Sequence, residues 1–374
     1  MHRTTSLLSG ITIVFAAVAL VECGAEPVSG SGKGSTGSVG STAAGSTTAG
    51  STTAGSGGAS VTSGGGGSVA SGGSNGTTVS TGAGGNTGTS TTGGVGGATG
   101  GSVGSGGAGG AGTTTSLHFA VYGDTRTDFT THQGIVDQIA KLNPQLVLHS
   151  GDLWDGYTTD MFRSILTKNA NIGALLNSGL FVAARGNHET VAAYNAFTPS
   201  LSRGNTGELF SYAFGNSFFV ILGMDPTGAA TFLDTELKKP AAIAARWRFV
   251  QSHFPVYSGG TTHGASGIPS IERLCDQYHV AVYWSGHDHI YERSHQVFGG
   301  QVVDTGDALT LSKGTVYVVS GGGGAPLYGV AMIATTHIQA STYNYVDVLA
   351  DPTKLTIKTY RLDGSLLDSY AISQ

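Results

Sequence analysis

The stretch VAVYWSGHDH, residues 280–289, runs from five apolar residues directly into a polar group with two histidines. A short apolar run rich in Val and aromatic residues is typical of a buried strand. Gly286 has no Cβ, so the chain can turn sharply after the strand and bring its backbone close to a metal or a phosphate. A single histidine after a strand is usually structural, so the stretch gains meaning only if other strands end in the same way.

The same pattern occurs four more times before residue 280. Apolar runs at 117–122, 145–149, 180–184 and 247–250 each lead into a small polar cluster. Stretches with helical character lie between the runs, among them 134–142 and 269–278. Alternation of strands and helices predicts a parallel or mixed sheet covered by helices.

In such sheets, ligands bind at the carboxyl ends of the strands, where all five clusters fall. We therefore expect six side chains to converge on one rim: Asp124, Asp152, Asn187, His253, His287 and His289. Two carboxylates, one amide oxygen and three imidazoles suit Zn, Mn or Fe. A Ca²⁺ site would use oxygen ligands alone.

The order of the five clusters resembles the calcineurin-like metallophosphoesterase superfamily. A closer likeness to its purple acid phosphatase branch comes from HFPVY (253–257), SGHDHIYER (285–293) and GTVYVVSGGGGAPLY (314–328). The resemblance covers essentially all of 117–374 and none of 1–116. It implies an α/β fold, a four-layer α/β/β/α sandwich of two mixed sheets.

The resemblance also implies two divalent or trivalent metal ions, Fe, Zn or Mn. By it, Asp124, Asp152 and His289 bind the first ion, and Asp152, Asn187, His253 and His287 bind the second. Asp152 would bridge, since only a carboxylate of this set can reach two ions about 3.5–4 Å apart. The likeness further assigns leaving-group protonation or transition-state stabilisation to His188, and a substrate-facing position to His263.

Two positions depart from the family pattern. Arg126 stands where the first motif often has a histidine, and Asp155 stands where the purple branch has a tyrosine ligand. Asp155 could be a fourth ligand of the first metal, which predicts a protein without the tyrosinate-to-iron colour. Arg126 could instead bind substrate phosphate in a bidentate way, or form a structural salt bridge.

The expected activity is hydrolysis of phosphate monoesters by in-line attack of a hydroxide formed at the metals. A phosphodiesterase or nucleotidase is the first alternative. The shape of the substrate pocket distinguishes these enzymes from a monoesterase, and the sequence does not show that shape. A non-catalytic, tethered metal-binding surface module is the second. The resemblance implies a small phosphate ester as the partner. The net charge of -5 offers no basic footprint for nucleic acid. The sequence gives no indication of the oligomeric state.

The chain before residue 117 predicts an exported protein. Residues 1–23 resemble a signal peptide whose apolar run ends close to Cys23, similar to a bacterial lipobox, although Glu22 departs from that pattern. Residues 24–116, rich in Gly, Ser and Thr, predict a disordered linker that tethers the catalytic domain 117–374. We therefore expect a secreted or lipid-anchored protein in the bacterial periplasm or at the cell surface. A lipid on Cys23 would be its only membrane contact, and Cys275 is expected to be a buried free thiol.

Overall fold

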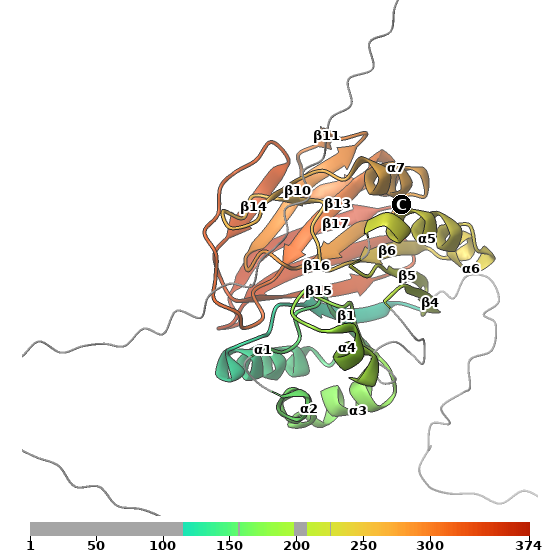
Figure 1. The fold of residues 1–374 in the computed structure, drawn as a ribbon. Coiled ribbons are helices and arrows are strands. Elements are labelled where there is room, and N and C mark those ends of the chain that lie inside the picture. The colour runs from blue at the N-terminus through green and yellow to red at the C-terminus, as the bar shows by residue number, and fades with distance from the viewer. Residues whose placement is uncertain (1–114, 156–157, 198–207, 225) are drawn as a thin grey trace, which may run out of the picture. The chain divides into compact units, whose positions relative to one another are not determined.

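The computed structural model describes residues 115–374, except 156–157, 198–207 and 225 (Figure 1). The expected signal peptide at 1–23 and nearly all of the expected linker at 24–116 lie outside the described residues, so both stay predictions. Among the residues that are described, none belongs to a helix long and apolar enough to cross a membrane.

The first sheet has seven strands in the order β12-β17-β16-β15-β1-β2-β3. Its strands are β1 (Leu117–Tyr122), β2 (Leu146–His149), β3 (Phe181–Ala183), β12 (Ala308–Thr310), β15 (Asn344–Ala350), β16 (Lys354–Arg361) and β17 (Leu366–Ser373). β1, β2 and β3 run parallel to one another. β15, β16 and β17 extend the sheet from the other side of β1 as an antiparallel meander, so the sheet is mixed.

The second sheet has eight strands, seven of them in the order β11-β10-β13-β9-β6-β5-β4, with β14 paired to β10. Its strands are β4 (Phe210–Phe214), β5 (Ser217–Ile221), β6 (Trp247–Gln251), β9 (Val282–Ser285), β10 (Tyr291–Phe298), β11 (Gln301–Asp304), β13 (Thr315–Ser320) and β14 (Thr336–Ala340). β5, β6, β9 and β13 are parallel. A separate two-stranded sheet joins β7 (Tyr257–Ser258) to β8 (Ala265–Ser266).

Helices cover the outer face of each sheet. The first sheet carries α1 (Phe129–Leu142), α2 (Thr159–Thr167), α3 (Ala170–Asn177) and α4 (Val191–Phe197), whereas the second carries α5 (Pro226–Leu237), α6 (Pro240–Ala244) and α7 (Pro269–Gln277) (Figure 1). The helices expected around 134–142 and 269–278 are confirmed. α1 begins five residues earlier than expected, because Asp128 caps it by accepting from the N–H groups of Thr130 and Thr131.

Three apolar cores hold these layers together. Phe119, Trp284 and Val346 belong to the core between the two sheets. Phe162 belongs to the core between the first sheet and its helices, and Leu233 to the core between the second sheet and its helices. The structure therefore confirms a four-layer α/β/β/α sandwich, in which each layer buries the apolar face of the next.

The five expected strands are all present, and all lie in the parallel parts of the two sheets. Tyr122, His149 and Ala183 are in register at the carboxyl ends of β1, β2 and β3. Gln251 and Trp284 are in register near the ends of β6 and β9. Because parallel strands end at the same edge, the polar clusters that follow them meet at one rim of the sandwich.

Candidate metal centre

The backbone at this rim is held in an unusual conformation. Asp124, Asp152 and His287 have φ values of 58°, 55° and 70°, in the left-handed region that non-glycine residues rarely adopt. Such conformations persist only where the surroundings enforce them, and they cluster at functional sites. Here the N–H of Asp124 donates to the Gly151 carbonyl at 3.0 Å, and the N–H of Thr125 donates to the Asp152 carbonyl at 2.9 Å. These bonds clamp the loop after β1 to the loop after β2.

The glycines that precede the candidate ligands provide space for their carboxylates. A Cβ at Gly186 would lie 2.1 Å from Asp152 Oδ1, and one at Gly286 would lie 2.1 Å from Asp124 Oδ2. Both distances are far below van der Waals contact. Gly151, directly before Asp152, has a φ of 99° that favours glycine, whereas Gly186 and Gly286 have no positive φ and are required for space. They leave room for two buried carboxylates to approach the neighbouring loops.

One group of candidate ligands consists of Asp124, Asp152 and His289. All three are at most 1% exposed, and one ligand atom from each lies within 4.8 Å of the others. His289 Nδ1 donates to the Pro326 carbonyl at 2.7 Å, so its Nε2 is left to face Asp124 Oδ1 at 3.7 Å. Burial and the charge of Asp152 raise the pKa of Asp124 well above its ordinary value. A cation between the two carboxylates would offset this cost, so the group fits a metal ion.

A second group consists of Asn187, His253 and His287. Asn187 Oδ1 lies 2.8 Å from His253 Nε2 and 3.1 Å from His287 Nδ1. His253 Nδ1 donates to the Ser150 carbonyl at 2.9 Å, so in the neutral ring Nε2 carries a lone pair. A nitrogen lone pair and an amide oxygen thus face each other, and a cation would satisfy both.

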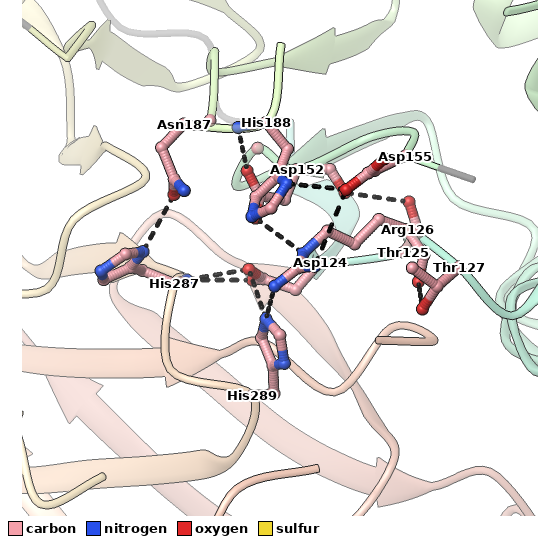
Figure 2. Close-up of polar contacts among 12 residues, drawn as sticks. Asp124, Thr125, Arg126, Thr127, Asp152, Asp155, Asn187, His188, His287 and His289 are labelled. Atoms are coloured by element: carbon pink, nitrogen blue, oxygen red, sulfur yellow. Dashed lines mark hydrogen bonds and ion pairs between the residues drawn. The ribbon is translucent and has the colours of Figure 1, made fainter. Parts of the chain in front are cut away.

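Asp152 lies between the two groups. Its Oδ1 is 3.4 Å from His253 Nε2, and its carboxylate also belongs to the group with Asp124 and His289. The structure therefore brings together all six side chains that the sequence placed at the rim (Figure 2 shows five of them).

The three histidines are in the form that binds metals. Burial lowers the pKa of His253. Burial and the nearby His253 lower the pKa of His287 to about 3, and burial and the charge of Arg126 lower the pKa of His289 to about 3. All three imidazoles are therefore neutral at neutral pH, and a neutral ring nitrogen is the ligand that a metal ion requires.

Asp155 is placed beside His188 and outside the group of Asp124, Asp152 and His289. Its Oδ2 accepts a hydrogen bond from His188 Nδ1 at 2.9 Å, and its side chain is 49% exposed. His188 Nε2 then points toward Asp152, with 3.8 Å between it and Oδ2 (Figure 2). The carboxylate of Asp155 thus orients the ring of His188 toward the rim.

His263 lies over the second group of candidate ligands. Its ring stacks on His287 with centroids 4.1 Å apart, and its Nδ1 lies 3.4 Å from Asp288 Oδ1. The side chain is 28% exposed, so it borders the rim from the solvent side.

Arg126 reaches into the rim, where its guanidinium contacts three of these residues. Nε lies 3.2 Å from Asp152 Oδ2, Nη1 lies 3.9 Å from Asp155 Oδ2, and Nη2 lies 3.5 Å from His289 Nε2. The residue is 8% exposed. Of the alternatives left open by the sequence, the structure shows an ion pair with the candidate ligand Asp152.

Glu189 and Asp288 complete the site, although the sequence analysis gave them no part in it. Glu189 accepts from the N–H groups of Asp152, Leu153, Trp154 and Gly186 at 2.7–3.4 Å. Burial and the charge of Asp152 raise the pKa of Glu189 to about 8. Asp288 accepts from Ser258 Oγ at 2.5 Å and the Gly264 N–H at 3.1 Å. Both carboxylates directly adjoin predicted site residues, which is the signal that the sequence offered.

Comparison with protein families agrees with this geometry. Residues 117–291 match the family model described as calcineurin-like phosphoesterase. The matched segment contains every candidate ligand, and the resemblance expected from the five clusters is confirmed.

Two curated relatives match parts of the chain. Purple acid phosphatase 5 of Arabidopsis thaliana is 26% identical over 232 residues, which cover 58% of this chain and 55% of the relative. A nucleotide pyrophosphatase/phosphodiesterase of Hordeum vulgare is 29% identical over 120 residues, which cover 30% of this chain and 32% of the relative. The chain thus spans about half of the first relative and about a third of the second.

Solved structures share the fold. A purple acid phosphatase from yellow lupin (Lupinus luteus) seeds has a TM-score of 0.56 at 22% identity, covering 70% of this chain and 54% of its own. GAP50, the anchor in the inner membrane complex of Plasmodium, has a TM-score of 0.51 at 13% identity, covering 69% and 89%. At these identities the likeness supports the architecture alone.

Proposed function

We propose that this chain, whose residues 117–291 match the calcineurin-like phosphoesterase family, hydrolyses phosphate monoesters with the help of two metal ions. The observation that carries the proposal is the position of Asp152. Its buried carboxylate lies between the group of Asp124 and His289 and the group of Asn187, His253 and His287. That arrangement is the one a bridging ligand needs.

The two groups would hold Fe, Zn or Mn, because imidazole and carboxylate ligands together suit these metals. Bound there, the ions would supply Lewis-acid stabilisation of phosphoryl oxygens and would lower the pKa of water. Asn187 contributes a ligand oxygen without a negative charge, so the site keeps a positive field for phosphate. The left-handed backbone at Asp124 and Asp152 keeps both carboxylates aimed at the rim before any substrate arrives.

His188 is proposed to serve the leaving group. Asp155 holds the ring by accepting from Nδ1, so Nε2 faces the rim next to Asp152. From this position a protonated Nε2 can pass its proton to the departing alkoxide or hydrogen-bond to a phosphoryl oxygen. His263, stacked on His287 at the solvent side, is placed to contact substrate from the opposite group of ligands. Arg126, which pairs with the candidate ligand Asp152, would add positive charge beside the phosphate of the bound substrate.

A phosphodiesterase or nucleotidase is the second candidate. The barley relative, named a nucleotide pyrophosphatase/phosphodiesterase, favours it. The Arabidopsis relative, named a purple acid phosphatase, matches a longer part of the chain, and we rank the monoesterase first for that reason. A non-catalytic, tethered metal-binding module is the third candidate. The oriented pair of His188 and Asp155 argues against it, since metal binding alone does not require that pair.

Metal-dependent turnover tests the proposal. The full chain is stripped with a chelator and resupplied with Zn, Mn or Fe, and hydrolysis of an aryl phosphomonoester is compared with that of the matching diester. We expect metal-restored monoester turnover that Asp152→Ala lowers by on the order of 10³-fold or more, because both ions lose a ligand. Asp160→Ala, an exposed substitution on α2, is the matched control and should leave turnover unchanged.

Each outcome separates the candidates. A faster diester reaction would favour the second candidate. Folded protein that binds metal without turnover on either ester would favour the non-catalytic module. Turnover that survives Asp152→Ala would remove the proposed site.

We further propose an extracytoplasmic location, secreted or lipid-anchored through Cys23, on the basis of residues 1–23. The intact mass of protein extracted from membranes tests the anchor. We expect the mass of a chain that begins at Cys23 and carries a lipid. A chain with an unmodified amino terminus, found in the soluble fraction, would contradict lipidation.

A further inference from the structure

Hydrogen bonds hold the backbone on both sides of Arg126 beside Asp152. The N–H groups that flank it, on Thr125 and Thr127, donate to the carbonyls of Asp152 and Asp155 at 2.9 and 2.8 Å. Thr125 Oγ1 adds a bond to the Leu153 carbonyl at 2.8 Å. The backbone from which the Arg126 side chain extends therefore has a fixed position beside the rim.

The guanidinium of Arg126 contacts two atoms that would bind the first metal ion. Nε lies 3.2 Å from Asp152 Oδ2, and Nη2 lies 3.5 Å from His289 Nε2 (Figure 2). His289 Nδ1 donates to the Pro326 carbonyl, so Nε2 is the nitrogen available to a metal. An ion held by Asp152 and His289 would thus lie directly beside a second positive charge.

The second group of ligands has no such neighbour. Asn187 Oδ1, His253 Nε2 and His287 Nδ1 lie 2.8–3.3 Å from one another. Among the described residues, no guanidinium or ammonium group hydrogen-bonds to these three atoms, although the charge of Arg126 also acts on His253. The two positions therefore differ in the charge that faces an entering cation.

This difference has a large expected effect. Arginine stays charged at any physiological pH, so its repulsion of a cation cannot be removed by losing a proton. In a protein-like dielectric, a unit charge about 4 Å from a cation changes an equilibrium by a factor on the order of 10³ for each unit of the cation's charge. The carboxylates of Asp152 and Asp155, which lie 3.2 and 3.9 Å from the guanidinium, offset part of this repulsion and leave a smaller factor.

We infer that Arg126 makes the two metal positions unequal. The ion at Asn187, His253 and His287 is held tightly, and the ion at Asp124, Asp152 and His289 is held on the order of 100-fold more weakly. The inference rests on the proposed two-metal site and states which of its two positions binds metal first. Arg126 then supplies part of the positive charge that the weaker ion would otherwise bring.

Metal stoichiometry tests the inference without any assay of activity. The full chain is stripped with a chelator and equilibrated with Zn²⁺. Retained metal is measured by elemental analysis after gel filtration, and affinities are measured by calorimetric titration. Wild type is expected to retain one ion per chain and to bind a second on the order of 100-fold more weakly. Arg126→Gln removes the charge and is expected to retain two ions.

Matched variants identify the two positions. Arg126→Lys keeps the charge and is expected to retain one ion, as wild type does. His289→Ala is expected to keep the tightly held ion, whereas His253→Ala is expected to lose it. Circular dichroism of each variant confirms that it is folded before its metal content is compared.

Two results would overturn the inference alone. Two ions of equal affinity in wild type, with no change in Arg126→Gln, would show that Arg126 does not weaken the first position while leaving the two-metal site intact. Loss of the tight ion in His289→Ala, with retention in His253→Ala, would reverse the assignment. Absence of bound metal in every folded variant would instead overturn the proposed site and the inference together.

Discussion

Four backbone N–H groups converge on the buried carboxylate of Glu189. They belong to Asp152, Leu153 and Trp154 in the loop after β2, and to Gly186 in the loop after β3. One side chain thereby fixes the spacing between the bridging candidate Asp152 and the loop that carries Asn187. Residues of this kind contact no substrate and still control the geometry of a metal site.

Replacing this carboxylate tests its role at the residue scale. In Glu189→Gln the side chain keeps one acceptor oxygen, and its amide nitrogen faces backbone N–H groups that need an acceptor. We expect metal affinity to fall about 10- to 100-fold with the ligands themselves unchanged. Competition with a metal-binding dye measures the affinity. Glu208→Gln, which alters a carboxylate paired with Arg185 at 2.7 Å, is the control and should keep wild-type affinity. Equal losses in both variants would contradict the role given to Glu189.

At the scale of single elements, α1 begins immediately after the loop that carries Asp124 and Arg126. Asp128 caps this helix, since its Oδ1 accepts from the N–H groups of Thr130 and Thr131, both at 3.0 Å. The cap ends the loop at a defined point and starts the helix that packs Ile135 and Ile139 against the first sheet. Burial alone would raise the pKa of Asp128, but the hydrogen bonds from Thr131 and Thr130 outweigh it and hold the pKa below its ordinary value.

The cap predicts a pH-dependent contribution to stability. Because the pKa is lowered in the folded state, the contribution of the charge is present above the unfolded pKa of about 3.9 and is lost as pH falls through the folded pKa. Asp128→Ala is expected to lower the free energy of unfolding by about 1 kcal/mol at pH 7, and by less near pH 3. Asp128→Asn keeps a side-chain oxygen that accepts the capping bonds, so it should retain most of the cap's contribution to the free energy of unfolding. Because Asn does not titrate, that contribution should no longer change with pH. Urea denaturation at both pH values measures this, and an equal loss for Asp128→Ala at the two pH values would contradict it.

At the scale of the whole molecule, the candidate site depends on how the two sheets are joined. Asp124, Asp152 and Asn187 follow strands of the first sheet, whereas His253 and His287 follow strands of the second. A buried ion pair between two other strands also crosses between the sheets. Arg293 on β10 donates to Asp368 on β17 from Nε at 2.7 Å and from Nη2 at 3.1 Å.

The same arginine provides a matched comparison, because it also contacts Asp307, which is 60% exposed. Arg293 itself is 1% exposed, so Asp368→Ala would leave its buried charge with the exposed Asp307 as its remaining carboxylate partner, at a cost of about 3 kcal/mol. Asp307→Ala removes an exposed partner and should cost less than about 1 kcal/mol. Guanidinium denaturation of the two variants measures the difference. Similar losses in both would show that the pair does not join the sheets in the way described.

The sequence by itself determined the five strands that precede the polar clusters, the order of those clusters and the edge at which they meet. Each cluster directly follows its own apolar run, so the evidence was local, and the topology of parallel strands brings such clusters together. The likeness to a known family then supplied the four layers. Cys275, within the helix expected at 269–278, was also expected to be buried, and the structure confirms it as a free, buried thiol.

Only the tertiary structure decided which side chains touch one another within the site. Asp155 bonds to His188, Arg126 lies on Asp152 and His289, and Glu189 accepts from two loops. Each of these contacts joins loops that are separated in the sequence, and each depends on differences of a few ångströms in how the loops approach. Spacing along the chain does not carry that information. These contacts form only in the folded chain, where glycines allow the loops to approach closely, the backbone adopts left-handed conformations and the loops hydrogen-bond to one another.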